Sequence, residues 1–430
     1  MSNKSISSFI NEEYKNYAKY VIYLRAIPHI IDGLKPVHRK IFYTALKHCK
    51  GPFLKTAALA GYVMAEANYH HGSAPVEGAI SNLTQDFVGA NNVPMFSGEG
   101  SFGNRMIQEP AAARYTKVKL NSEFLKVFND FEILDKSEDP ENPEPLCYLP
   151  TIPWVLVNGA EGIAVGFSTY VLPRDPEAIK HWIRNKLEGK GSHYNFEPYF
   201  KGFKGKIYKN PESNNSWVME GCFERLKKNV VRITEIPIGF DLEKYVNYLD
   251  KLIENKKVRD YEDKCKKDFE FIVKMEKEYD DEAIIKILRL RTTLTEDLVV
   301  IDNENRLRQF DKPEEIVEYF IEYRLKKYNE RIKRNVRLTN DVLELIEEKK
   351  RFIKLVLEKK IDLSVHTKAS LIKHLLNNKF SHAEALVEMK IYHFTKDEIE
   401  KLNDEEQKQK KYLEELHNMT GEKEWMRELK

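Results

Sequence analysis

Apolar residues recur at helical spacing near the start of the chain and predict its first element. The members of this series are Phe9, Ile10, Tyr14, Tyr17, Ala18, Val21 and Leu24. Steps of three and four residues place such side chains on one face of an amphipathic helix, here over residues 8–27. Pro28 ends this helix, because the residue before a proline is disfavoured in the helical region. Pro36 then opens a helix that extends to about Lys47.

The pattern predicts two further helices, over about residues 55–67 and 74–87, joined by a short turn that contains Gly72. A helix, a glycine-containing turn and a helix within a basic region form the outline of a helix-turn-helix, although many helical hairpins bind nothing. Apolar runs at residues 152–159 and 162–166 predict short paired strands. Residues 175–305 carry both helical and strand signals, which predicts a mixed α/β domain.

The character of the chain changes at Pro313, where a long helical series begins. Its apolar seam consists of Val317, Ile321, Leu325, Tyr328, Ile332 and Val336. Such a seam needs a partner helix. Thr395 and Glu398 form a capping box at the start of a second long helix, and residues 352–394 between the two helices predict a small helical globule. We interpret this charged arm as a spacer and dimer contact rather than as a catalytic part.

Composition narrows the classes of protein that fit. A chain of 430 residues is long enough for about three domains. The net charge is only +2, but residues 1–55 carry ten Lys or Arg against three acidic residues, an excess that attracts polyanions. The four cysteines show no CxxC spacing, which argues against a zinc knuckle or a disulfide framework and fits a reducing compartment. The apolar segment at residues 150–173 is interrupted by Gly and Pro, so we do not expect it to span a membrane.

Tyr115 is the strongest candidate for chemistry, because Arg114 and three alanines precede it. A phenol has a pKa near 10, and it becomes a nucleophile only where positive charge stabilises the phenolate and the phosphate that it attacks. The planar guanidinium of Arg114 suits phosphate oxygens, and the small alanines leave room for a large substrate. Taken alone, the same residues also fit a tyrosine packed at a strand edge beside a solvated arginine.

Other polar residues suggest contacts with an anion. Lys35, His38 and Arg39 fall in the first turn of the helix that Pro36 opens, where free N–H groups also favour negative charge; a solvated helix start is the alternative. His70 and His71 are adjacent and have no close third ligand, so we favour contact with phosphate or phenol over zinc. The sequence shows no DxD-type cluster near Tyr115 and no phosphate-binding loop of the ATPase type.

Several uncommon strings occur in a fixed order over nearly the whole chain. They are Arg25-Ala26-Ile27-Pro28, Asp32-Gly33-Leu34-Lys35-Pro36-Val37-His38-Arg39, Tyr69-His70-His71-Gly72, Phe102-Gly103, Ala111-Ala112-Ala113-Arg114-Tyr115 and Asn158-Gly159-Ala160-Glu161-Gly162-Ile163-Ala164-Val165-Gly166. On these strings the chain resembles the breakage-reunion subunits of type IIA DNA topoisomerases, the family of gyrase A and topoisomerase IV C, and especially the medium subunits of T-even-type phage enzymes.

The resemblance implies a role for each matching residue. Tyr115 would attack a DNA phosphodiester to give a 5′-phosphotyrosyl link, with Arg114 and His71 as the other catalytic residues. The implied DNA-binding residues are Arg25, Lys35, His38, Arg39, His70 and Val171. Val171 occupies the position of an isoleucine that wedges between base pairs in the family, and it offers one methylene less, about 0.8 kcal/mol of apolar contact. No metal ligand is implied in this chain.

The resemblance also implies a fold class, an α+β multidomain protein with a winged-helix DNA gate, a mixed α/β tower and a long antiparallel coiled coil. The expected domains are an N-terminal helical arm at residues 1–30, a winged-helix breakage-reunion domain at 31–150, a tower domain at 151–310 and a coiled-coil arm at 311–430. A globule at about residues 352–394 would form the C-gate.

The family's chemistry requires partners. We expect double-stranded DNA, a second copy of this chain, and a subunit that carries the ATPase and Toprim parts and binds both Mg²⁺ and ATP, all in the cytoplasm of a bacterium or phage-infected host. The loop Glu99-Gly100-Ser101-Phe102-Gly103 departs from the family pattern, and we expect no DNA-wrapping β-propeller after the arm. Relaxation and decatenation are therefore expected rather than supercoiling. The alternatives are an architectural DNA-binding protein, in which Tyr115 is only structural, and a true supercoiling gyrase A chain.

Overall fold

The computed structural model describes residues 6, 10–191 and 196–429. Its contacts divide the chain into two compact units, one that reaches Arg324 and one that begins at Leu325, so the boundary falls within a single long helix. Among the described residues, no helix combines the length and the apolar composition needed to cross a lipid bilayer. The four-domain division stays a prediction.

The first described element is a continuous helical run that consists of η1 (Ile10–Tyr14), α2 (Lys15–Val21) and η2 (Ile22–Ala26). The predicted helix is confirmed over these residues, and its first positions, Ser8 and Phe9, lie outside the described residues. The C-terminal half of the run packs on β13 (Leu298–Ile301) through Val21, Ile22 and Ala26. The N-terminal half is exposed along its length.

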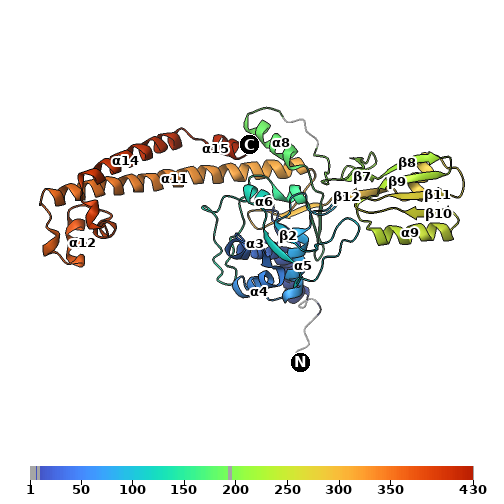
Figure 1. Cartoon of the computed structure of the whole chain (residues 1–430), viewed down its shortest axis with the longest axis horizontal. Helices are drawn as coiled ribbons and strands as arrows, with labels where there is room; N and C mark the ends of the chain where they lie inside the picture. Colours follow the sequence, from blue (N-terminus) through green and yellow to red (C-terminus); the bar gives the residue numbers. More distant parts are fainter. Residues whose placement is uncertain (1–5, 7–9, 192–195, 430) are drawn as a thin grey trace, which may run out of the picture. The chain divides into compact units, whose positions relative to one another are not determined.

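Three helices and a small sheet follow (Figure 1). Tyr115 lies in the chain between two strands of this sheet. The helices α3 (Pro36–His48), α4 (Thr56–Glu66) and α5 (Ser73–Thr84) confirm the predicted series, with proline in the first turn of α3. The antiparallel sheet has the order β1 (Leu54–Lys55), β3 (Lys117–Leu120), β2 (Phe96–Glu99), and α6 (Ser122–Val127) follows β3. An aromatic core holds these elements together; its rings are Phe42, Phe124, Phe128, Tyr148 and Trp154.

One secondary-structure prediction is wrong and a neighbouring one needs new boundaries. Trp154–Asn158 forms the short helix α7, not a strand, and the paired strands are β4 (Ala160–Ile163) and β5 (Ser168–Val171). The four apolar residues at the start of α7 are all buried, and a continuous buried run does not distinguish a helix from a strand. Gly159 ends α7 with a φ of 71°, a conformation that glycine adopts at little cost.

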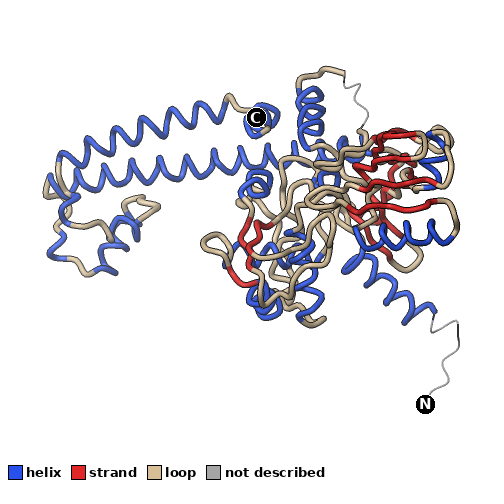
Figure 2. The backbone as a smooth tube through the Cα atoms, turned by 45° about the vertical axis from the view of Figure 1, so that its right-hand side comes forward, coloured by secondary structure: helices blue, strands red, loops and turns tan. Residues whose placement is uncertain are grey.

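The rest of the first unit confirms the predicted mixed α/β character (Figure 2). One sheet has the order β12 (Arg291–Thr295), β7 (Ser216–Glu220), β6 (Lys206–Lys209), and a second has the order β10 (Val258–Asp263), β11 (Phe271–Met275), β9 (Val230–Glu235), β8 (Cys222–Lys227). Tyr245 and Leu249 of α9 (Leu242–Glu254) share a core with the second sheet. The remaining elements are α8 (Pro176–Leu187), α10 (Asp281–Ile287) and β14 (Leu307–Phe310), which pairs with β13.

The second unit contains most of α11 (Pro313–Leu357), which is 45 residues long, and α14 (Lys396–His417). The predicted cap is confirmed, because the Thr395 side chain accepts a hydrogen bond from the Glu398 N–H (3.2 Å). Leu402 of α14 packs on Ile346 and Ile353 of α11. The predicted helical globule contains η3 (Leu363–Val365), α12 (Lys368–Asn377), α13 (Ala383–Val387) and η4 (Ile391–His393), and α15 (Gly421–Glu428) ends the unit.

Candidate active site

Tyr115 stands on a turn that buried neighbours hold in place. Its N–H donates to the Ala112 carbonyl (2.8 Å), and the next residue, Thr116, is fully buried. Thr116 donates its hydroxyl proton to the Thr56 hydroxyl (2.8 Å), while the Thr56 N–H donates to the Thr116 carbonyl (3.0 Å) at the start of α4. The Tyr115 side chain itself is 71% exposed. The Tyr115 phenol is therefore exposed to solvent on a turn whose backbone is held by hydrogen bonds.

Arg114 supplies positive charge directly beside this phenol. Its guanidinium carbon lies 5.1 Å from the centre of the Tyr115 ring, within the range of a cation–π contact. Both side chains are exposed, so a large anionic ligand can reach both at once. The prediction that places this cation beside Tyr115 therefore agrees with the geometry.

Arg39 forms a buried ion pair with Asp32. Its Nε and one terminal nitrogen donate to the two carboxylate oxygens of Asp32, at 2.9 and 3.1 Å, and Arg39 is only 9% exposed. Asp32 is fully buried and also accepts the N–H groups of Leu34 and Tyr148, each at 3.0 Å. Arg39 is thus engaged in a buried ion pair, which argues against a contact with the DNA backbone, and that role stays a prediction.

Lys35 and His38 lie on the same helical start, and burial lowers the pKa of both. The Lys35 ammonium donates to the Glu161 carbonyl (2.6 Å), and burial lowers its pKa. Burial also lowers the pKa of His38, to about 3, with Lys35 and Arg39 adding to the effect. His38 is therefore neutral at physiological pH and brings no charge to an anion, whereas Lys35 stays a candidate contact.

His70 and His71 follow α4 on an exposed turn. His71 is hydrogen-bonded through Nε2 to the hydroxyl of Tyr20, and the ring of Tyr69 packs edge-on against it, with centroids 5.3 Å apart. The turn is held from behind by Lys40, whose ammonium donates to the Ala67 carbonyl (2.7 Å) and pairs with Glu144 (3.0 Å).

Sequence reasoning missed both Tyr20 and Lys40 as supports of this turn. Lys40 lies next to the motif that ends at Arg39, and Tyr20 lies on the predicted first helix. No local pattern indicated their partners, because Lys40 meets Glu144 across 104 positions and Tyr20 meets His71 across 51.

Arg25 and Val171 have opposite environments. Arg25 is exposed in the last turn of η2, which agrees with a contact to DNA. Val171 is only 2% exposed, and it lies in β5, where its backbone pairs with Ala160 of β4. This burial argues against a wedge between base pairs in this conformation, and the role of Val171 stays a prediction. On the same hairpin, Ile163 is 81% exposed.

Comparison with known proteins settles the family. Residues 25–430 match the family model that describes the A subunits of DNA gyrase and topoisomerase IV. This chain belongs to that family. The DNA topoisomerase medium subunit of Enterobacteria phage T4 is 33% identical over 421 residues, which cover 94% of this chain and 93% of that protein. DNA topoisomerase 2 of Arabidopsis thaliana is 34% identical over 391 residues, which cover 87% of this chain but 26% of the plant enzyme.

A solved structure agrees with these sequences. The crystal structure of the DNA-binding, cleavage and re-ligation domain of Plasmodium falciparum topoisomerase II matches with a TM-score of 0.88 at 27% identity, and the match covers 98% of this chain and 63% of that one. The expected family is thereby confirmed, as is the expected activity of a type II topoisomerase subunit in DNA cleavage and religation. The fold is the mixed α+β fold of this cleavage domain.

No ready-made metal site accompanies Tyr115 in the described part of this topoisomerase chain. One group of three acidic or histidine side chains lies close enough together to share an ion, and it consists of Glu344, Glu348 and His382 in the second unit. Glu348 already accepts the backbone N–H groups of Ser381 and His382, so it holds the segment that precedes α13. We therefore assign this group a structural role.

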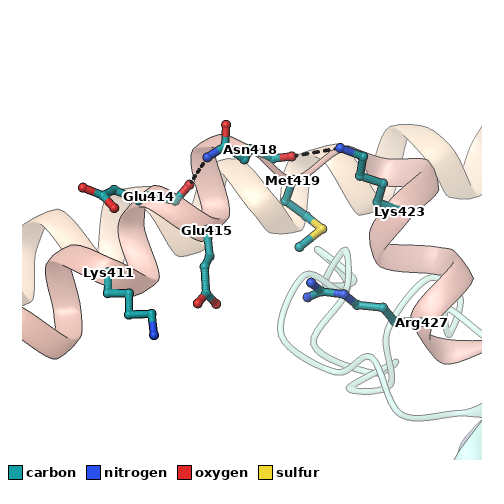
Figure 3. A pocket seen from close by; sticks show the side chains of 7 residues that line it. All are labelled: Lys411, Glu414, Glu415, Asn418, Met419, Lys423 and Arg427. Carbon is teal, nitrogen blue, oxygen red and sulfur yellow. Dashed lines mark hydrogen bonds between the residues drawn. The ribbon is translucent and has the colours of Figure 1, made fainter.

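The open pocket in Figure 3 is also separate from the candidate residues. It is lined by residues of α14, α15 and the turn between them, namely Lys411, Glu414, Glu415, Asn418, Met419, Lys423 and Arg427. The Lys423 ammonium donates to the Asn418 carbonyl (3.4 Å) across this turn. All of these residues belong to the second unit, whereas Tyr115, Arg114 and His71 belong to the first.

Two half-buried histidines, His29 and His38, predict a pH dependence of stability. Desolvation by burial lowers the pKa of His29 to about 4 and that of His38 to about 3, against an ordinary 6.5. Below about pH 6.5 these two histidines bind protons in the unfolded chain but stay neutral in the folded chain. The free energy of unfolding should therefore fall as the pH drops from 6.5 toward 4. Urea titrations at pH 7 and pH 5 would measure this loss. His38→Gln should show a smaller loss than wild type, and an equal loss in both would contradict the assignment.

Proposed function

We propose that this chain is the cleavage and religation subunit of an ATP-dependent type IIA DNA topoisomerase, with Tyr115 as its nucleophile. The observation that carries the proposal is the exposed Tyr115 phenol on a turn fixed by Thr56 and Thr116, with the Arg114 guanidinium 5.1 Å from its ring. Family membership supports the class of reaction, and this geometry supports the choice of residue.

In the proposed reaction, the Tyr115 oxygen attacks the phosphorus of a DNA phosphodiester. A new bond forms between this oxygen and the 5′-phosphate, the bond to the 3′-oxygen breaks, and the 3′-oxygen takes up a proton as the phenol loses one. Arg114 stabilises the negative charge that develops on the phosphate oxygens. One phosphoester replaces another, so the 3′-hydroxyl can reverse the reaction and reseal the strand without an external energy source. Two copies of the chain cut the two strands.

Further residues of the first unit would hold the DNA. Arg25, Lys35 and His70 are the proposed contacts to the backbone, because their polar groups lie at partly or fully exposed positions. His71 would act near the reacting oxygens. We propose that residues 31–150 form the winged-helix part and residues 151–310 the tower. The helices α11 and α14 would form the coiled-coil arm, with the globule as a C-gate contact between copies.

Mg²⁺ and ATP belong to a partner subunit in this proposal. The described residues around Tyr115 do not form a carboxylate cluster, so they do not fit a resident metal ion. A divalent ion supplied by the partner would polarise the phosphate and stabilise the leaving oxygen. The proposed complex therefore contains a dimer of this chain together with subunits that carry the ATPase and Toprim parts.

The test is to trap the covalent intermediate. The chain is mixed with its ATPase/Toprim partner, Mg²⁺ and supercoiled plasmid, and the reaction is quenched with detergent. We expect linear DNA with protein attached at the 5′ ends and with free 3′-hydroxyls that a polymerase can extend. A parallel reaction with EDTA should give no adduct. Protein found on the 3′ ends, or DNA that is bound but never cut, would contradict the proposal and favour an architectural role.

A further inference from the structure

We infer that Tyr20 is a positioning residue for DNA cleavage, which holds the His71 imidazole in one orientation and presents its Nδ1 side to the DNA. This inference rests on the proposed function of His71. The Tyr20 hydroxyl is hydrogen-bonded to His71 Nε2, and the two rings meet edge to face with centroids 6.1 Å apart and planes at 66°. Nothing in the local sequence links the two residues, which are 51 positions apart.

The hydrogen bond with Tyr20 occupies Nε2 of His71, so Nδ1 is the ring nitrogen left for a ligand. When the imidazole is neutral, one nitrogen carries the proton and the other accepts. If the Tyr20 hydroxyl donates to Nε2, the proton must be on Nδ1; if the ring is charged, both nitrogens carry protons. In both of these cases Nδ1 is a donor, whereas a neutral ring whose Nε2 donates to the phenol oxygen would have Nδ1 as an acceptor. We infer one of the first two arrangements, because a donor at Nδ1 suits an oxygen of a DNA phosphate. The Tyr20 phenol thus orients the imidazole through its second nitrogen, as a hydrogen-bond partner does for many functional histidines.

A second aromatic ring restricts the imidazole further. Tyr69 packs against His71 with the two planes at 79°. With Tyr20 on Nε2 and Tyr69 against the ring, rotation of the imidazole would break one contact or the other. His71 nevertheless stays exposed, so the rest of its ring is open to a ligand.

Tyr20 is itself held by the protein core. The residues that follow it, Val21 and Ile22, are buried against Val299 and Ile301 of β13. The backbone of the next segment continues this attachment, since the Ile30 N–H donates to the Ile301 carbonyl (2.8 Å). One turn earlier, Tyr17 is 55% exposed. Tyr20 therefore lies where the first helix becomes fixed, and its hydroxyl is a defined anchor for His71.

The experiment compares Tyr20→Phe with Tyr17→Phe, which removes the same hydroxyl from an exposed position of the same helix. Single-turnover cleavage with the partner subunit, Mg²⁺ and plasmid should be about tenfold slower for Tyr20→Phe and unchanged for Tyr17→Phe. The thermal midpoint should not change in either variant, because a hydrogen bond between partly exposed groups adds little to stability.

Two readouts separate positioning from a general effect. In a His71→Ala background, the added Tyr20→Phe change should cause no further slowing, because the residue that Tyr20 holds is gone. In addition, ¹⁵N NMR of histidine-labelled protein without DNA, at a pH where the His71 ring is neutral, should show the proton on Nδ1 in wild type and in Tyr17→Phe but not in Tyr20→Phe.

Equal cleavage rates for Tyr20→Phe and wild type, or the same slowing in the His71→Ala background, would overturn the inference. So would an unchanged ¹⁵N spectrum. The NMR measurement needs no DNA cleavage, so it decides which ring nitrogen carries the proton even if wild type forms no adduct. Absence of the adduct in wild type would instead count against the proposed function itself.

Discussion

Tyr115→Phe is expected to abolish the covalent protein–DNA adduct while DNA binding and thermal stability stay unchanged. Phenylalanine lacks the oxygen that forms the phosphotyrosyl bond, and loss of a nucleophile typically slows an enzyme by at least about 10⁴-fold. The ring is 71% exposed, so its hydroxyl has little to do with packing. The Arg114 guanidinium can still lie over a phenylalanine ring, which keeps the local arrangement of the turn.

Detergent-quenched cleavage of plasmid with Mg²⁺ and the partner subunit measures the adduct, and a binding titration measures affinity for the same DNA. Tyr62→Phe is a matched control, because Tyr62 is also exposed, at 40%, and its ring stacks on His48 without needing the hydroxyl. This control should cleave like wild type. An adduct that persists in Tyr115→Phe would show that another residue is the nucleophile.

Local sequence signals predicted much of the fold, because several elements carry their own start and stop residues. Pro36 at the start of α3 and Thr395 at the start of α14 each act within one turn of the helix that they begin. The prediction at α7 was wrong because the apolar residues of this segment are all buried, so the sequence shows neither a helical nor a strand period there. A hydrophobic pattern predicts an element where one face of that element is exposed to solvent. It does not distinguish helix from strand where every face is buried.

The same reasoning explains the site. Tyr115 and Arg114 are adjacent in the chain, so the contact between guanidinium and phenol could be expected from the sequence alone. Arg39 and Val171 could not be placed, because their environments come from distant residues. Tyr148 shares the carboxylate of Asp32 across 116 positions, and the N–H groups on either side of Val171, those of Tyr170 and Leu172, donate to Asp297 and Glu296. A motif therefore identified which residues belong to the family pattern but not which of them face the solvent.

Arg39→Ala is expected to destabilise the first unit rather than to weaken DNA binding in a folded protein. The carboxylate of Asp32 is fully buried, and Arg39 is the cation that neutralises it, through contacts of 2.9 and 3.1 Å. Removal of one partner from a buried ion pair leaves an uncompensated charge and typically costs about 3–5 kcal/mol. Urea unfolding followed by circular dichroism should show this loss as a lower midpoint. Arg39→Lys, which keeps the charge but not the two-pronged contact, should lose less.

Two comparisons decide between a structural and a DNA-binding role for Arg39. If the cost of Arg39→Ala comes from the unpaired carboxylate, then adding Asp32→Asn should recover part of the stability, because the buried charge is gone. Arg25→Ala removes an exposed cation, so it should leave the unfolding midpoint unchanged and lower the salt dependence of DNA binding by about one unit of slope. An Arg39→Ala protein that keeps the wild-type midpoint but shows the reduced salt slope would contradict the structural role. It would support the DNA contact that the motif alone predicted for Arg39.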